Sequence, residues 1–268
     1  MTALSHHRPG PTEERPGETP DTVRAGPVDL RAWLGGTGRP QLDVPLAPTP
    51  PRLAGARTPR VALVGGGVDR QHPDLAGAHV VVWPGGRGLA PDVTATAYAS
   101  LLVGQGVAHA RGLVPDAVLL VAAVEHPDEP STDAATARAV RWCVGAGAEV
   151  IVLPYGRRRL GRRLTVTLHA AMAHGTRVFA AAGDLGPDIL TFPGSVTGVV
   201  AVTAHDGSRL LAGCSACADI AAPGADVPAA GPRSRTRLRG SGAATVLAAG
   251  AHLTAVAAEP DTAPLLLR

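Results

Sequence analysis

The chain has 268 residues, of which 45% are hydrophobic, 18% charged and 3% aromatic. This composition excludes a wholly disordered chain, and the length suits one α/β domain with an additional arm. The formal net charge of +3 gives no strong argument for nucleic-acid binding, and no stretch has the roughly 18 uncharged apolar residues that span a bilayer.

The N-terminal part is rich in proline and glycine, so residues 1–58 predict a mostly irregular arm. Within it, residues 28–34 predict a short helix that docks Trp33 on the domain. Residues 1–21 contain no apolar segment of the secretory type, and the cysteine count of three is odd. We therefore expect a cytoplasmic protein with reduced thiols and with neither a membrane nor a nucleic acid as partner.

From residue 60 onward, apolar runs alternate with helix-length segments. The runs that suit buried parallel strands are residues 61–64, 118–124, 150–153, 177–182 and 198–202. The segments that predict helices are residues 131–145, 164–173 and 243–258. The alternation predicts an α/β fold with a doubly wound parallel sheet and helices on both faces. This domain would cover residues 59–259, followed by a tail of residues 260–268.

Five segments carry a resemblance to a known family. They are residues 61–75, which include His72-Pro73-Asp74-Leu75; residues 112–117; residues 150–156; residues 180–186, which begin Ala-Ala-Ala-Gly; and residues 240–250. In this order and at this spacing they resemble the subtilisin-like (S8) serine peptidases, over roughly residues 58–258. The resemblance implies the subtilisin-like fold for this part of the chain.

The same resemblance assigns four positions to catalysis. It places Gly65 where the family has its aspartate, Thr94 at the histidine, Gly242 at the serine and Asp184 at the oxyanion-hole asparagine. A serine nucleophile needs a base within hydrogen-bond reach and a group that orients this base. Glycine and threonine supply neither, so the resemblance implies a degenerate member without catalytic residues: a pseudopeptidase.

Two alternatives would keep some chemistry in the cleft. Ser241 lies one residue from the expected nucleophile, and a local shift could present it, which would make the chain a serine-type peptidase with a non-standard site. Asp184 resembles the aspartate that the sedolisins, relatives of this family, use at the oxyanion position. Its simpler interpretation, which we favour, is a turn residue or a helix cap.

A peptide-binding edge is the further expectation from the resemblance. Its predicted residues are Pro154, Tyr155, Gly156, Arg157, Arg158, Arg159, Arg162 and Arg163. A peptide could add a strand to this edge by backbone hydrogen bonds, and the arginines would favour an acidic peptide or protein partner. The alternative is a solvated charged loop. We expect a scaffold, an adaptor or a partner of an active enzyme, with peptide natural-product processing as one setting.

No cofactor or metal is expected. Cys214 and Cys217 have the spacing of a metal-binding pair, but the sequence offers no second pair or flanking histidine, and Cys143 lies in an apolar helical pattern. The glycines at residues 65–67 follow a strand, but they lack the lysine and the glycine spacing of a nucleotide-binding loop.

Overall fold

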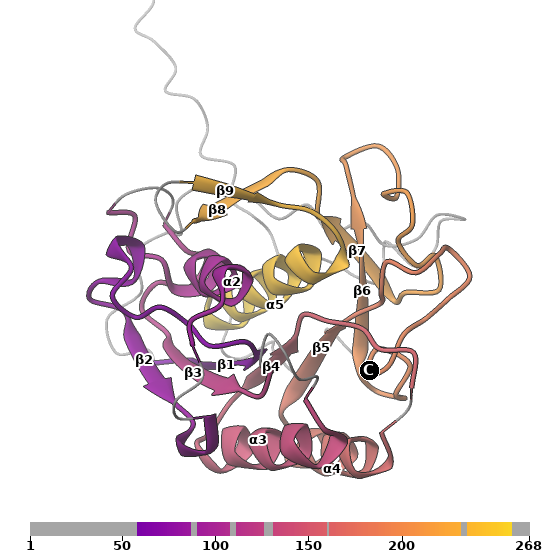
Figure 1. Cartoon of the computed structure of the whole chain (residues 1–268), viewed down its shortest axis with the longest axis horizontal. Helices are drawn as coiled ribbons and strands as arrows, with labels where there is room; N and C mark the ends of the chain where they lie inside the picture. The colour runs from indigo at the N-terminus through magenta and orange to yellow at the C-terminus, as the bar shows by residue number, and fades with distance from the viewer. Residues whose placement is uncertain are drawn as a thin grey trace, which may run out of the picture.

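A parallel sheet of seven strands forms the centre of the computed structural model, in the order β2-β3-β1-β4-β5-β6-β7 (Figure 1). The structure describes residues 58–86, 90–107, 111–125, 131–159, 161–231 and 235–258. The strands of the sheet are β1 (Arg60–Gly65), β2 (His79–Val82), β3 (Val118–Ala123), β4 (Val150–Leu153), β5 (Arg177–Ala181), β6 (Val200–His205) and β7 (Ile220–Pro223). A separate antiparallel pair consists of β8 (Val227–Ala230) and β9 (Arg235–Leu238).

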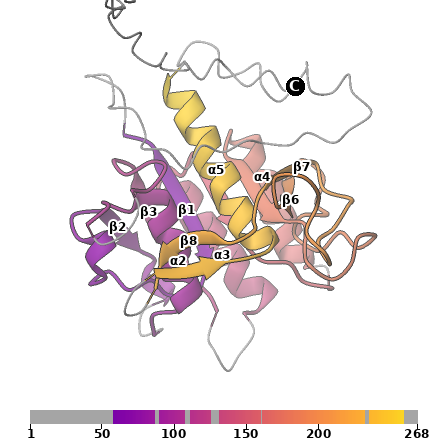
Figure 2. The same cartoon turned by 90° about the horizontal axis from the view of Figure 1, so that it is seen from above.

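Helices cover both faces of this sheet. Helices α2 (Val93–Val103) and α5 (Ser241–Ala258) lie on one face, and α3 (Asp133–Gly145) and α4 (Arg162–Ala173) on the other (Figure 1). Figure 2 shows α5 crossing over the sheet beside α2 and the β8–β9 pair. Two short 3-10 helices, η1 (Pro73–Leu75) and η2 (Pro84–Gly86), complete the elements. The predicted doubly wound α/β fold is therefore confirmed.

Small and β-branched residues build the core between the sheet and its helices. The central strands β1, β3 and β4 are almost entirely buried runs of Val, Leu, Ile and Ala, which suit strands that are covered on both faces. Helix α5 is built mainly of Ala, Val, Leu and Gly and is buried along most of its length. One apolar core lies between the sheet and α2 and α5, and a second lies on the side of α3 and α4.

All five predicted strands and all three predicted helices are present. The largest shift among the strands is in β6, which begins at Val200 rather than at residue 198 and extends to His205. Helix α4 begins two residues earlier than predicted, at Arg162. The patterns above do not indicate β2, β7 or the β8–β9 pair, although the run of three valines in β2 is a strand signal.

The chain order of the strands reverses around β1, because β2 and β3 lie on one side of β1 and β4 to β7 on the other. In open parallel sheets, ligands bind at the carboxyl ends of strands where the order reverses. The expected site therefore lies where β1 and β4 end. Apart from residue 58, the predicted arm, with its short helix at residues 28–34, lies outside the described residues, as does the tail. In the described parts of the chain, no helix is long and apolar enough to span a bilayer.

Candidate functional site

The first predicted site position, Gly65, is the last residue of β1 and lies at this edge. Its carbonyl oxygen accepts hydrogen bonds from Val124 N at 2.8 Å and from Glu125 N at 3.1 Å. A Cβ atom on Gly65 would meet no other atom within 4 Å. The backbone at this position is thus held in place, and the space that a side chain would enter is open.

The second position, Thr94, is an exposed residue in the first turn of α2. The helix begins there because Asp92 caps it, with Asp92 Oδ1 accepting a hydrogen bond from Ala95 N at 2.7 Å. A Cβ on Gly66 would lie 2.8 Å from Asp92 Cβ, so the start of α2 is pressed against the end of β1. Asp92 therefore places a carboxylate next to Gly66, the residue after Gly65. Sequence reasoning missed this residue, although an aspartate before a helix is a capping signal.

The third position, Gly242, is the second residue of α5, and Tyr98 fills the space beside it. A Cβ on Gly242 would stand 2.6 Å from the carbonyl oxygen of Pro154 and closer still to Tyr98 Oη. Tyr98 lies in α2, one turn after Thr94. Two helices that are far apart in sequence thus bring a phenol to the position that the resemblance assigns to the nucleophile.

Tyr98 remains a neutral phenol in this environment. Burial raises the pKa of Tyr98 to about 12, and the negative charges of Asp184, Asp92 and Glu125 add to the effect. No hydrogen bond joins its hydroxyl group to another described residue. The phenol can therefore donate a hydrogen bond to a bound group, but at neutral pH it does not act as a base.

The fourth position, Asp184, caps α5. Its Oδ1 accepts hydrogen bonds from Ser241 N at 3.0 Å and from Cys214 Sγ at 2.9 Å. Gly240, just before the helix, has φ of +108°, and a Cβ there would lie 2.6 Å from Asp184 Oδ2. The close approach of this carboxylate therefore requires glycine. The helix-cap interpretation of Asp184 is confirmed by these contacts.

Ser241, the alternative nucleophile, is only 1% exposed. Its backbone N–H donates to Asp184, and its carbonyl oxygen accepts a hydrogen bond from Thr245 Oγ1 at 2.7 Å. Among the described residues, no histidine or carboxylate forms a hydrogen bond with its hydroxyl group. The arrangement leaves Ser241 without the base that a serine nucleophile needs.

The predicted peptide-binding edge begins where β4 ends. No hydrogen bond joins the backbone of Tyr155 or Gly156 to another described residue, and Tyr155 is half-buried while Gly156 is exposed. The next residue ends the open segment, because Arg157 N donates to Phe192 O at 2.7 Å and Phe192 N donates to Arg157 O at 2.9 Å. The free backbone edge is therefore short.

Thr191 lies between this edge and the segment that follows β5. A Cβ on Gly156 or on Gly183 would overlap the Thr191 side chain. Thr191 Oγ1 also donates to the carbonyl oxygen of Ala182 at 3.0 Å. Thr191 thus fills the space between the segment that the resemblance assigns to substrate pairing and the segment that it assigns to the oxyanion hole. Sequence reasoning missed it, because its role depends on contacts with distant glycines.

The five arginines of the predicted edge do not form one free cluster. The Arg157 guanidinium donates to the carbonyl oxygen of Ser131 at 2.6 Å and to Glu125 Oε1 at 3.2 Å, and it lies 5.0 Å above the centre of the Tyr155 ring. Arg157 therefore has a structural role, and its contact with a partner stays a prediction. The other four are exposed and form no ion pair with any described residue: Arg158, Arg159, Arg162 and Arg163.

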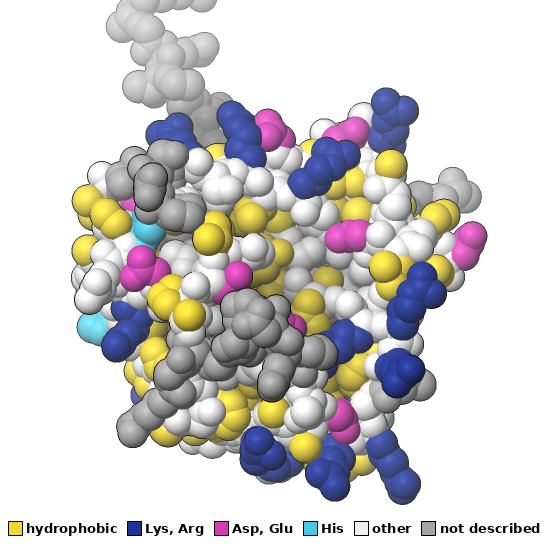
Figure 3. Space-filling model, in the orientation of Figure 1, with side chains coloured by type: hydrophobic (Ala, Val, Ile, Leu, Met, Phe, Trp, Pro, Cys, Tyr) yellow, Lys and Arg dark blue, Asp and Glu magenta, His cyan; other side chains and the backbone are white. Residues whose placement is uncertain are grey.

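The charge distribution on the face in Figure 3 matches this arrangement. Basic side chains lie along the upper, right and lower margins with some acidic side chains among them, while the hollow in the middle is lined largely by hydrophobic and uncharged atoms. Since the chain contains no lysine, these basic side chains are arginines. The exposed arginines around the hollow suit a partner with negative charges.

None of the three cysteines forms a disulfide bond. Burial, followed by the hydrogen bond to Asp184 and the charge of this carboxylate, raises the pKa of Cys214 to about 12, so its thiol stays protonated. Cys217 is exposed, and burial raises the pKa of Cys143 to about 12. Within the described residues, no group of three or more His, Cys, Asp or Glu side chains could hold a metal ion.

The family is decided by comparison with known proteins. Residues 56–267 match the family model described as the subtilase family. The chain belongs to the subtilase family. Thermitase of Thermoactinomyces vulgaris is 28% identical over 204 residues, which cover 71% of this chain and 72% of thermitase. Subtilisin BL of Lederbergia lenta is 30% identical over 144 residues, which cover 52% of this chain and 54% of that protein.

Two solved structures with a similar fold are maturation proteases. The prenylagaramide maturation protease PagA has a TM-score of 0.68 at 25% identity, with 75% of this chain and 77% of PagA covered. The patellamide maturation protease PatA has a TM-score of 0.65 at 27% identity, with 73% of this chain and 77% of PatA covered. The fold of this subtilase is thus related to that of peptidases that act in natural-product maturation.

Proposed function

We propose that this subtilase-family chain binds a peptide or protein partner without hydrolysing it. The observation that carries the proposal is the contact between α2 and α5, where Tyr98 Oη occupies the space beside Gly242. The three assigned triad positions hold Gly65, Thr94 and Gly242, which offer no nucleophile, no base and no carboxylate. Loss of a whole triad costs about a millionfold in turnover.

The backbone of Tyr155 and Gly156 supports binding. Their N–H and C=O groups have no partner among the described residues, and exposed backbone groups at the end of a strand can pair with an extended peptide. Such pairing places the peptide across the end of β4, beside Tyr98. The neutral Tyr98 phenol would then donate a hydrogen bond to the peptide where an active peptidase presents its nucleophile.

Charge and relatives indicate the kind of partner. The exposed arginines of residues 158–163 favour an acidic peptide, or an acidic surface of an active enzyme. The likeness to proteases named for prenylagaramide and patellamide maturation supports a role in peptide natural-product processing, as a scaffold or adaptor that holds a precursor.

The test begins with selection of peptides from a phage-displayed library on the purified full chain. A selected peptide should bind reversibly and keep its intact mass after overnight incubation, whereas an active subtilisin should cut it. Methylation of the backbone nitrogens that pair with the edge should abolish binding, because methylated nitrogen cannot donate. Cleavage of the peptide by the chain, or the recovery of no binding peptide, would overturn the proposal.

A further inference from the structure

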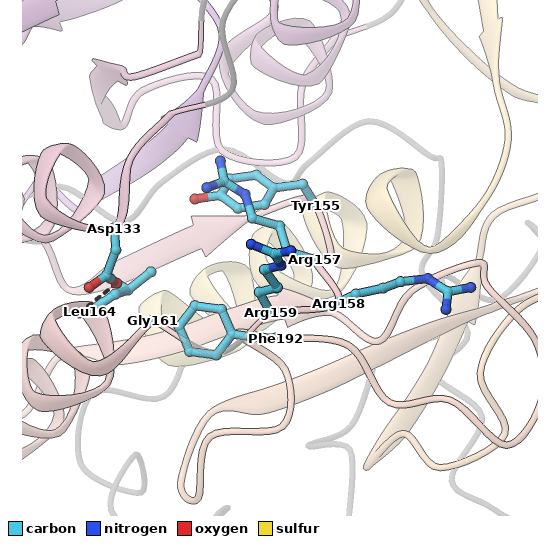
Figure 4. A pocket seen from close by; sticks show the side chains of 8 residues that line it. All are labelled: Asp133, Tyr155, Arg157, Arg158, Arg159, Gly161, Leu164 and Phe192. Atoms are coloured by element: carbon cyan, nitrogen blue, oxygen red, sulfur yellow. Dashed lines mark hydrogen bonds between the residues drawn. The ribbon is translucent and has the colours of Figure 1, made fainter.

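A pocket lies directly beside the open backbone of Tyr155 and Gly156. It has a volume of about 320 Å³ and lies between the segment after β4 and the N-terminal ends of α3 and α4 (Figure 4). Tyr155 lines it, so a peptide that pairs with this edge would lie next to the opening. A side chain of that peptide is therefore the natural occupant of the pocket.

The walls of the pocket are apolar, and backbone hydrogen bonds hold one of them in position. Phe192 and Leu164 line it and are only 4% and 3% exposed, and the Tyr155 ring lies on the opposite side (Figure 4). Two backbone hydrogen bonds between Phe192 and Arg157 fix one wall. These surfaces favour the methylene groups of a bound side chain.

Two of the four charged side chains that line the pocket already have partners. The Asp133 carboxylate accepts hydrogen bonds from Arg163 N at 2.9 Å and Leu164 N at 3.0 Å, so it caps α4, whose N-cap residue Gly161 has no side chain. The Arg157 guanidinium is bonded to Glu125 and Ser131. Neither group is available to a ligand without the loss of these contacts.

Two positive charges in the lining remain available. Arg158 and Arg159 are exposed and pair with no described acidic residue. In Figure 4, Arg159 lies between Arg157 and Phe192, whereas Arg158 extends away from the other side chains. A carboxylate at this end of the pocket would reach Arg159, and the planar guanidinium group can hold it by two hydrogen bonds.

We infer that this pocket binds a glutamate side chain of the peptide, with its methylene groups against Phe192 and Leu164 and its carboxylate on Arg159. The inference rests on the proposed peptide-binding function and specifies the side chain that the site selects. Glutamate suits the pocket better than aspartate, because its longer stem covers the apolar wall before the carboxylate reaches the arginine.

Fluorescein-labelled octapeptides of alanine and serine provide the test, with one glutamate moved through all eight positions and glutamine at the same position as reference. At one position, glutamate should bind about ten-fold more tightly than glutamine, as measured by fluorescence anisotropy. Arg159→Gln should remove this preference. Arg138→Gln, an exposed arginine of α3 outside both the pocket lining and the predicted edge, is the matched control and should keep it.

Three results would overturn the inference. Equal affinity for glutamate and glutamine at every position would exclude an acid-selective pocket. Tighter binding of a leucine peptide than of its glutamate counterpart would make the pocket a purely apolar one. An unchanged preference in Arg159→Gln would place the acidic contact elsewhere. Binding of the peptides without any glutamate preference leaves the proposed function intact, whereas no binding of any peptide removes both proposals.

Discussion

Replacement of Gly242 by serine would put a side chain into space that Tyr98 and the Pro154 carbonyl group already fill. The new Cβ would stand 2.6 Å from the Pro154 oxygen, which belongs to the backbone and cannot swing away, and closer still to Tyr98 Oη. Tyr98 would have to leave its rotamer or α5 would have to shift. Either response costs about 1–3 kcal/mol of folding free energy.

The helix itself offsets part of this cost, because serine is a better helix residue than glycine by about 0.5 kcal/mol. The net loss for Gly242→Ser should be about 1–2 kcal/mol. For a domain of this size, about 2–4 °C of Tm corresponds to each kcal/mol. We therefore expect a fall in Tm of about 5 °C by differential scanning calorimetry.

Gly145→Ser is the matched control, because Gly145 lies in α3 and a Cβ there would meet nothing within 4 Å. Its Tm should stay the same or rise slightly. A double-mutant cycle with Tyr98→Ala tests the contact itself, since Tyr98→Ala and Gly242→Ser together should cost less than the sum of the two single changes. Equal Tm values for Gly242→Ser and Gly145→Ser, together with additive effects in the cycle, would refute the reasoning.

Three further changes test the surroundings of the cleft. Asp184→Ala should lower the free energy of unfolding by about 1–2 kcal/mol through loss of the α5 cap, and Asp184→Asn by less; equal losses in denaturant titrations would argue against capping. Burial, then the charge of Arg177, lowers the pKa of His252 to about 4, so the unfolded state, with a pKa near 6.5, binds more protons as the pH falls from 6.5 to 4. Between these pH values, the free energy of unfolding of the wild type should fall by about 3 kcal/mol more than that of His252→Gln, and below pH 4 the difference should grow no further. Parallel curves of stability against pH for the two proteins would exclude this role. Arg157→Ala should cost about 2 kcal/mol, because it leaves the Ser131 carbonyl and Glu125 without their partner, while Arg158→Ala should stay within about 0.5 kcal/mol; equal Tm values would contradict the structural role of Arg157.

The sheet and the order of its helices could be predicted because apolar runs and caps are local signals. β1, β3 and β4 read as short runs of buried residues, and α3 and α4 begin and end near capping residues or glycine. The β2 strand, at residues 79–82, carries three valines and could have been found in the same way. Helix α2 is harder to recognise, because nearly all of its residues are apolar or small and no polar face marks its period.

The contacts that define the cleft could not be read from local patterns. Tyr98 reaches Gly242 across 144 residues of chain, and Thr191 lies between Gly156 and Gly183 only once β4 and β5 are paired. The basic run after β4 did indicate a positively charged surface. It could not show that Arg157 is bonded to Ser131 and Glu125, because Glu125, after β3, and Ser131, before α3, reach Arg157 only in the folded chain.

The central claim is that the cleft of this subtilase contains no activated serine, and a fluorophosphonate probe measures this directly. The full chain is incubated with the probe beside an active subtilisin, and both intact masses are determined. We predict no adduct on this chain under conditions in which the subtilisin is fully labelled. A stoichiometric adduct that is lost in Ser241→Ala would contradict the account and identify a working serine peptidase.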